Sequence, residues 1–267
     1  MNRTDVLTAP LSALGRFSIS QIQSMGRITI FFIKGMFHIF SFPLQVSKFI
    51  HQVYFIGMKS IFVICLTGGF TGMVLGFQGY YTLTKVGSEG MLGALVGLTL
   101  IRELGPVLTA IMVTGRAGSA IAAEIGIMRI SEQIDALETM DINPIRFLFG
   151  PRLGAALFSF PLLTALFDTI GIFGGYVTGS MLLGINPGIY FARTVSSVDM
   201  ADVTGGFIKS VVFAAVVVTV SCYQGYYTHT RAEGFGAKGV SLSTTTAVVH
   251  SCVLILATDY VLTSFLI

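Results

Sequence analysis

The chain has 267 residues, of which 53% are hydrophobic and only 11% are charged, and its formal net charge is +3. Its mean hydropathy is +0.81. Soluble domains carry roughly a quarter charged residues, so this composition excludes a soluble globular protein and predicts a polytopic membrane protein. A net charge this small gives no reason to expect a nucleic-acid partner.

The N-terminal part of the chain is expected to lie on the membrane surface rather than to cross it. Its apolar run ITIFFIKGMFHIFSFPL is short, is interrupted by Lys34 and His38, and stops at Pro43. Basic residues spaced along such a run are typical of interfacial helices. We also expect no signal peptide, since no compact apolar core precedes a small-residue cleavage site. We therefore predict an interfacial or elbow region over residues 1–57 and a five-span domain over residues 58–267.

Five later stretches are long and apolar enough to span a membrane. A crossing helix needs about 20 predominantly apolar residues. The stretches lie at about 60–84, 90–123, 153–183, 205–224 and 244–267. The sequence thus predicts an all-α integral membrane fold in which an N-terminal interfacial helix precedes five transmembrane helices.

Lysine and arginine residues are distributed unequally between the two sides of these spans. Most of them precede the first span or lie in the connections between spans two and three and between spans four and five. The other side has only Lys85 and Arg193 in its connections. The positive-inside rule then places the N-terminus in the cytoplasm and the C-terminus on the opposite side. Lys209, near the outer end of span four, is expected to snorkel outward.

Two spans carry glycines at the spacing of closely packed membrane helices. Span one has Gly68, Gly72 and Gly76, and span three has Gly171, Gly175 and Gly179. Small residues at this spacing let helix backbones approach closely in lipid. We expect most of these faces to pack within one subunit, and the alternative that some of them serve a homodimer stays open.

The second span carries charges at bilayer depth, namely Arg102, Glu103, Arg116 and Glu124. Such side chains cost several kcal/mol in lipid, so they normally face a cavity or a partner and mark functional sites. Pro106 follows directly and should kink the span and free backbone carbonyls within it.

Beyond the second span, the helical pattern continues into an amphipathic segment. Apolar residues recur in steps of three and four, and acidic residues follow another face. The apolar face is Ile127, Ile130, Ile134 and Leu137, and the acidic face is Glu132, Asp135 and Glu138. We predict one helix with a bend near Gly126 and an end at Asn143-Pro144. An acidic face is unsuited to the negative cytoplasmic leaflet, so this helix is expected to dock into a protein groove.

Long segments in this order resemble the MlaE-type permease family. They are GGFTGMVLGFQGY, LIRELGPVLTAIMVTGRAGSAIAAEIGIMRISEQIDALETMDINPIRFLFGPR, FIKSVVFA, QGYYT and TTTAVVHSCVLILATDYVLT. The resemblance covers nearly the whole chain from about Gln52 onward. It implies the permease subunit of an ABC transporter that moves phospholipids between the inner and outer membranes of Gram-negative bacteria.

The resemblance also implies an assembly and a location. Two permease copies would form a homodimer in the inner membrane, with the C-terminus of each in the periplasm. A cytosolic ABC ATPase dimer would bind ATP and magnesium, so this chain itself would hold no cofactor and no metal and would not be an enzyme. A cytosolic STAS-type regulator and a periplasmic ring of MCE-domain lipid-binding proteins would complete the system.

Site residues follow from the same resemblance. Residues 127–141 would form the cytosolic coupling helix between spans two and three, which contacts the ATPase. Its contact residues would be Ile127, Arg129, Ile130, Glu132, Gln133, Asp135, Leu137 and Glu138. Phospholipid would bind in a cavity between the two copies, lined by Arg102, Glu103, Val74, Leu75, Phe77 and Tyr81.

Two other classes of function remain as alternatives. An ion-coupled secondary carrier would use the intramembrane carboxylates Glu103, Glu124, Asp168 and Asp259 as its ion sites. Carriers usually show an internal repeat, which five spans do not provide. An intramembrane enzyme would need a nucleophile with its base or a metal set, and the sequence has no GxSxG or HExxH motif. It also lacks a GxxxxGK[ST] phosphate loop, so ATP hydrolysis would belong to a separate chain.

Overall fold

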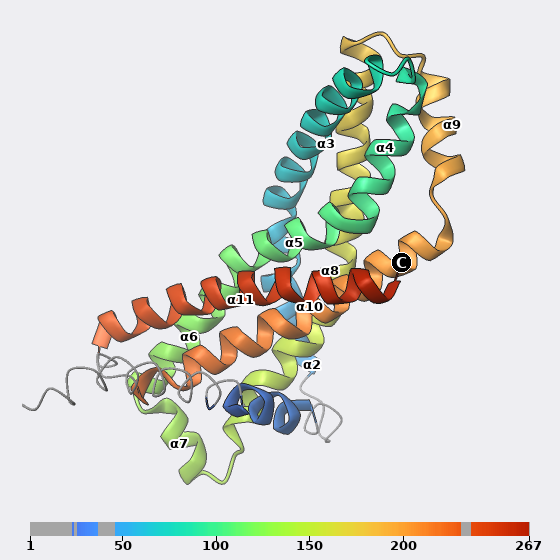
Figure 1. Ribbon diagram of the computed structural model, residues 1–267. Coiled ribbons are helices and arrows are strands. Elements are labelled where there is room, and N and C mark those ends of the chain that lie inside the picture. Colours follow the sequence, from blue (N-terminus) through green and yellow to red (C-terminus); the bar gives the residue numbers. More distant parts are fainter. Residues whose placement is uncertain (1–22, 24–25, 37–45, 231–235, 267) are drawn as a thin grey trace, which may run out of the picture.

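The computed structural model describes residues 23, 26–36, 46–230 and 236–266, and within these ranges the chain is helical with no strand (Figure 1). Five of its helical segments are long and apolar enough to cross a membrane. They are Val46–Thr84, Glu89–Ile130, Pro144–Leu182, Met200–Tyr226 and Gly236–Leu266. The prediction of five candidate spans is therefore confirmed.

The first candidate span begins earlier than expected from hydropathy. Helix α2 (Val46–Ile56) leads through the short helix η1 (Met58–Ser60) into α3 (Ile61–Thr84). Before it, residues 26–36 form a helix whose Phe31 stacks edge-on against Phe149 of α8, with ring centroids 5.5 Å apart. The predicted stop at Pro43 lies outside the described residues. The interfacial position of this region and the boundary at residue 57 stay predictions.

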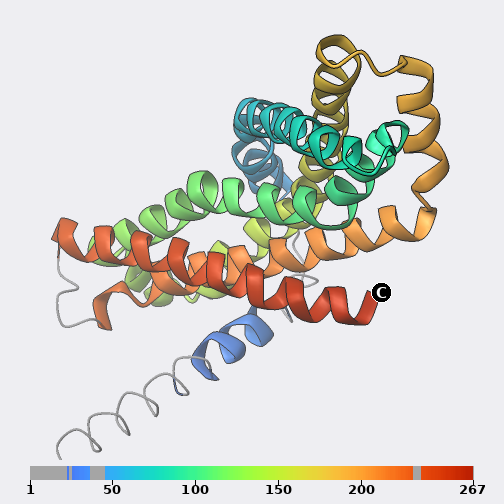
Figure 2. The ribbon, with the colours of Figure 1, turned by 45° about the horizontal axis from the view of Figure 1, so that its top comes forward.

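The second span changes direction sharply halfway along (Figures 1 and 2). It consists of α4 (Leu92–Thr99), the π-helical turn η3 (Leu100–Leu104), α5 (Gly105–Val113), a second π-helical turn η4 (Thr114–Gly118) and α6 (Ser119–Ile130). Pro106 lies at the first turn of α5. Since proline has no N–H to donate and its ring collides with the preceding turn, the predicted kink appears at this point.

Helices α3 and α8 (Pro144–Tyr176) pack through their glycines (Figure 2). A Cβ added at Gly72 would collide with the backbone of Gly171, and one added at Gly68 would lie 2.9 Å from the carbonyl oxygen of Phe167. Both glycine stripes thus bring helices together within one subunit, as expected. The faces of these glycines are therefore not available to a second copy.

Gly72→Ala is expected to lower the melting temperature of the purified chain. The added methyl group must displace backbone rather than a flexible side chain, and overpacking of this kind costs about 1–3 kcal/mol. Gly69→Ala is the matched control, because a Cβ there meets only Ile170 at 3.5 Å. Equal melting temperatures for the two variants would show that this close approach is absent.

The amphipathic segment is not one continuous helix, contrary to the prediction. Helix α6 runs straight through Gly126 to Ile130, so the expected bend near Gly126 is wrong. The chain breaks instead at Glu132, whose φ of 57° is left-handed, and resumes as α7 (Gln133–Thr139). The predicted end at Asn143-Pro144 is also displaced, since α7 already ends at Thr139. Asn143 instead begins α8, where its Oδ1 accepts the N–H of Ile145 at 3.0 Å.

The last turn of the third span is the π-helical η5 (Val177–Leu182), and a short helix, α9 (Pro187–Ser197), follows it without having been predicted. Asn186 caps α9 by accepting the N–H of Gly188 at 2.8 Å. Helix α9 packs on α4, where Gly93 approaches the backbone of Tyr190.

Two candidate spans complete the fold. They are α10 (Met200–Tyr226) and, beyond the turn η6 (Thr228–Thr230), α11 (Gly236–Leu266). These two helices lie side by side (Figures 1 and 2).

Candidate functional site

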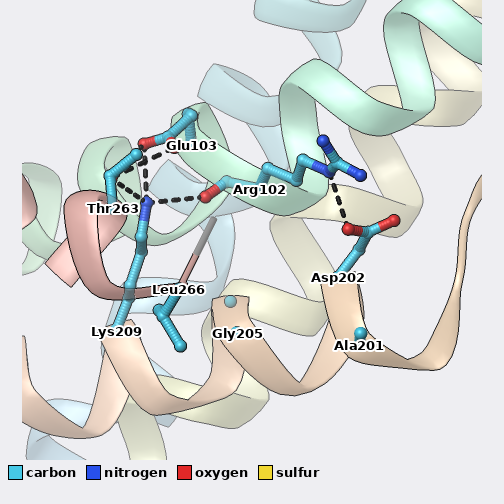
Figure 3. A pocket seen from close by; sticks show the side chains of 9 residues that line it. Arg102, Glu103, Ala201, Asp202, Gly205, Lys209, Thr263 and Leu266 are labelled. Carbon is cyan, nitrogen blue, oxygen red and sulfur yellow. Dashed lines mark hydrogen bonds and ion pairs between the residues drawn. The ribbon is translucent and has the colours of Figure 1, made fainter.

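Lys209 is the centre of a buried polar cluster beside the kink of span two (Figure 3). Its side chain, on α10, is only 3% exposed. The Nζ atom donates to Glu103 Oε2 at 2.7 Å, to Thr263 Oγ1 at 2.7 Å and to the Arg102 carbonyl oxygen at 2.9 Å. The expectation that Lys209 snorkels outward is therefore wrong, because three acceptors inside the bundle satisfy its ammonium group.

The kink itself supplies one of these acceptors. In a regular α-helix the carbonyl of Arg102 would accept the N–H of residue 106, but that residue is Pro106 and has none. The freed carbonyl accepts from Lys209 instead. Pro106 thus frees a backbone carbonyl as predicted, and the Lys209 ammonium group is the donor that satisfies it.

The cluster contains two carboxylates around one ammonium group. Asp259 Oδ1 on α11 lies 3.1 Å from Lys209 Nζ, opposite Glu103 on the second span. A buried charge is tolerated only where partners compensate it. The cluster thus ties α10, α11 and the kink together. Asp259 is thus paired within the bundle.

Arg102 faces away from this cluster and has its own partner. Its Nε donates to Asp202 Oδ1 at 2.7 Å, and its side chain is 47% exposed (Figure 3). Asp202 is held in turn by the capping box that it forms with Asp199 at the start of α10. Because neighbouring helix residues point about 100° apart, Arg102 and Glu103 reach different partners, Asp202 and Lys209.

Both side chains border one open pocket of about 200 Å³. Its walls come from span two, α10 and the end of α11, and Figure 3 shows them from close by. The lining residues are Arg102, Glu103, Ala201, Asp202, Gly205, Gly206, Lys209, Thr263 and Leu266. Only Arg102 and Glu103 were predicted to belong to a site, although a lone lysine within span four, Lys209, was a sequence signal for a third residue.

The other four lining residues expected from the resemblance lie elsewhere in this single chain. Val74, Phe77 and Tyr81 are between 53% and 67% exposed on the outer face of α3. Leu75 packs against the core instead. None of the four borders the pocket at Arg102.

The remaining carboxylates expected at bilayer depth have different surroundings. Glu124 Oε2 pairs with Arg152 Nη2 at 2.9 Å. Asp168 Oδ1 on α8 is buried and has no hydrogen-bond partner among the described residues. His250 Nδ1 lies 3.0 Å from Gln224 Nε2.

Arg129 fastens the segment after span two to the rest of the chain. Its Nη1 lies 2.7 Å from Asp135 Oδ1 on α7, and its Nε donates to His229 Nδ1 at 2.9 Å. Partial burial and the nearby guanidinium lower the pKa of His229 below its ordinary value, so its ring is neutral at pH 7. Glu138 is engaged as well, since Tyr226 donates to it at 3.2 Å.

These contacts divide the expected ATPase-contact residues into two groups. Arg129, Asp135 and Glu138 have partners within the chain. Glu132 and Gln133 are exposed, and their side chains have no hydrogen-bond partner among the described residues. Ile127 is 56% exposed, while Ile130 and Leu137 are partly buried.

The chain is similar to known membrane permeases along most of its length. The family model described as permease MlaE matches residues 49–265. An intermembrane phospholipid transport system permease protein of Haemophilus influenzae is 38% identical over 96% of this chain and 97% of its own length. A probable ABC transporter permease protein of Rickettsia bellii is 40% identical over 94% of this chain and 95% of its own length.

A more distant relative is the chloroplast protein TRIGALACTOSYLDIACYLGLYCEROL 1 of Arabidopsis thaliana, which is 36% identical over 90% of this chain and 65% of its own length. The family match spans all five candidate membrane helices, apart from the first residues of the first helix and the last residue of the fifth. The two bacterial relatives align over almost their full lengths. The chain therefore belongs to the MlaE permease family.

Proposed function

We propose that this chain is the permease subunit of an ABC transporter that moves phospholipids between the inner and outer membranes of a Gram-negative bacterium. The names of its relatives support the ABC permease role, and the Haemophilus relative is named for phospholipid transport. In this proposal a separate ATPase binds ATP and magnesium, and the present chain contributes no catalytic residue.

The observation that carries the proposal is the hydrogen bonding of the Arg102 guanidinium, which is only partly satisfied by the described part of the chain. Asp202 holds its Nε, while its two terminal nitrogens have no partner among the described residues and face an open pocket. Arginine binds phosphate through paired hydrogen bonds from such nitrogens. The guanidinium is therefore oriented but still available, which suits transient binding of a phospholipid phosphate.

The carboxylates argue for a permease over an ion-coupled carrier. Lys209 holds both Glu103 and Asp259, and Arg152 holds Glu124. An ion site needs carboxylates that are free to exchange a proton or a cation. Three of the four candidates are instead bound to internal cations, so they fit a structural role better.

The assembly that we propose has two copies of the chain, with their N-termini in the cytoplasm and their C-termini in the periplasm. Helix α7 and its flanking residues would contact the ATPase dimer, which in turn would bind a STAS-type regulator. An MCE-domain ring would cover the periplasmic face. The exposed α3 residues Val74, Phe77 and Tyr81 would meet lipid, either in the bilayer or in a cavity completed by the second copy.

Glu132→Lys is expected to weaken binding of the partner ATPase by roughly tenfold, because reversing a docked charge sets it against its partner. Glu132 is the informative position, since reversal of Asp135 would also break its ion pair with Arg129. The measurement is the affinity of the detergent-solubilised chain for its partner ATPase, with lipid-stimulated ATP hydrolysis as a second readout.

Glu89→Lys is the matched control, since it makes the same charge change at the start of span two, on the far side of the membrane. Its affinity for the ATPase should equal that of the parent chain. If Glu132→Lys binds the ATPase as tightly as Glu89→Lys does, the segment around α7 is not the docking site.

A further inference from the structure

A second polar pocket lies near the C-terminal end of span two, beyond the kink, and is lined by residues of α2, α6 and the start of α8. Helix α2 packs on α8, and Figure 1 shows α2 and α6 in its lower half, above α7. The pocket has a volume of about 350 Å³. It is lined by Ser47, Lys48, His51, Gln52, Glu124, Met128, Phe147, Leu148, Pro151 and Arg152. Nothing in the proposed transport function uses it.

Arg152 is almost fully buried in this pocket, at 5% exposure, yet it is incompletely satisfied. Its Nη2 pairs with Glu124 at 2.9 Å, and its Nη1 donates to the Leu148 carbonyl oxygen at 2.8 Å. Its Nε has no hydrogen-bond partner among the described residues. A buried guanidinium N–H without an acceptor is costly, so the pocket favours a ligand that supplies one.

Lys48 adds a positive charge that no carboxylate neutralises. Its Nζ lies 2.9 Å from the centroid of the Phe147 ring, and no described carboxylate is within ion-pair distance. Glu124 is the one acid in the lining, and it already pairs with Arg152. The pocket thus has a net positive charge before any contribution from His51.

The lining also has an apolar side and an unused acceptor. Met128, Phe147, Leu148 and Pro151 provide carbon surface next to the cations. Gln52 Oε1 is buried and receives no hydrogen bond among the described residues. A ligand that satisfies all of these groups carries a phosphate, a hydroxyl or ammonium donor, and an apolar portion. A phospholipid headgroup with its glycerol has these three parts.

We propose that this pocket binds the headgroup of a phospholipid from the cytoplasmic leaflet, with the phosphate between Lys48 and Arg152. The site is separate from the pocket at Arg102. Only its assignment to the cytoplasmic leaflet rests on the proposed orientation of the chain in the membrane. Because α6 and α8 flank α7, the bound lipid joins the two ends of the segment proposed to contact the ATPase.

The test is lipid binding by the purified full-length chain in neutral detergent, measured by native mass spectrometry. Dioleoylphosphatidylglycerol is the probe, and dioleoylglycerol, which has the same acyl chains without phosphate, is its control. Lys48→Gln should weaken retention of the phospholipid roughly tenfold, equivalent to about 1.4 kcal/mol. Lys48→Arg should retain it, since the charge is kept.

Lys59→Gln is the matched control, because Lys59 lies on η1 over the rings of Tyr54 and Phe55 and does not line the pocket. Arg193→Gln should also leave this binding unchanged, because Arg193 is exposed on α9 and does not line the pocket. Equal loss in Lys48→Gln and Lys59→Gln would overturn the proposal. So would displacement of the lipid by millimolar inorganic phosphate, since the site would then take free phosphate.

Discussion

Lys209→Met is expected to prevent the chain from accumulating as a folded membrane protein. The substitution leaves Glu103 and Asp259 facing each other in the bundle without the ammonium group that now holds both. It also removes the donor to the Arg102 carbonyl that Pro106 leaves without an N–H. Breaking a buried ion pair from one side costs about 3–5 kcal/mol, a large part of the stability of most domains.

The measurement is monodisperse yield and melting temperature in mild detergent. Lys85→Met serves as the control, because Lys85 is exposed above the Tyr81 ring. Adding Glu103→Gln and Asp259→Asn to Lys209→Met should restore folding, since the neutral amides no longer need a cation. A Lys209→Met protein that melts at the temperature of the parent would disprove the role of this cluster.

Arg102→Ala is expected to slow phospholipid transfer by roughly tenfold to a hundredfold, since hydrogen bonds to charged groups contribute about 1.5–3 kcal/mol. Folding should be retained, because a half-exposed ion pair such as that with Asp202 contributes at most about 1 kcal/mol. The measurement is transfer of a fluorescent phospholipid by the complete complex in proteoliposomes, with melting temperature recorded for each variant.

Two further variants separate the possible reasons for such a loss. Arg102→Ala leaves Asp202 unpaired beside the pocket, so Arg102→Ala with Asp202→Asn removes any repulsion by that carboxylate. Arg102→Lys keeps the charge but not the paired donors and should transfer lipid at an intermediate rate. Arg193→Ala on α9 is the control at an exposed arginine. Normal transfer by Arg102→Ala would place the lipid site elsewhere.

The five candidate spans were predictable because hydrophobicity is a local property of the chain. A stretch of about 20 apolar residues has few stable alternatives to a membrane helix. The first span nevertheless starts at Val46, well before the predicted residue 60, because hydropathy does not show where one helix continues into the next. Helix α9 was missed since it is short and polar and is held by contacts with α4.

The break at Glu132 had no signal in the sequence. Periodicity predicted one helical face from Ile127 to Leu137, but it does not reveal the single residue with left-handed φ that divides this stretch between α6 and α7. Such a conformation is uncommon for a residue other than glycine. Here contacts from Arg129 to Asp135 and His229 accompany the change of direction.

The sequence by itself determined the membrane class, the five candidate spans, the kink at Pro106 and the presence of two charged residues, Arg102 and Glu103, within an apolar span. Each of these depends on the properties of one residue or one short stretch. Only the tertiary structure decided that Lys209 turns inward to Glu103, and that the glycines of α3 and α8 pack against each other. The partners in such contacts are separated by about a hundred residues along the chain, and helix packing alone determines which of them meet.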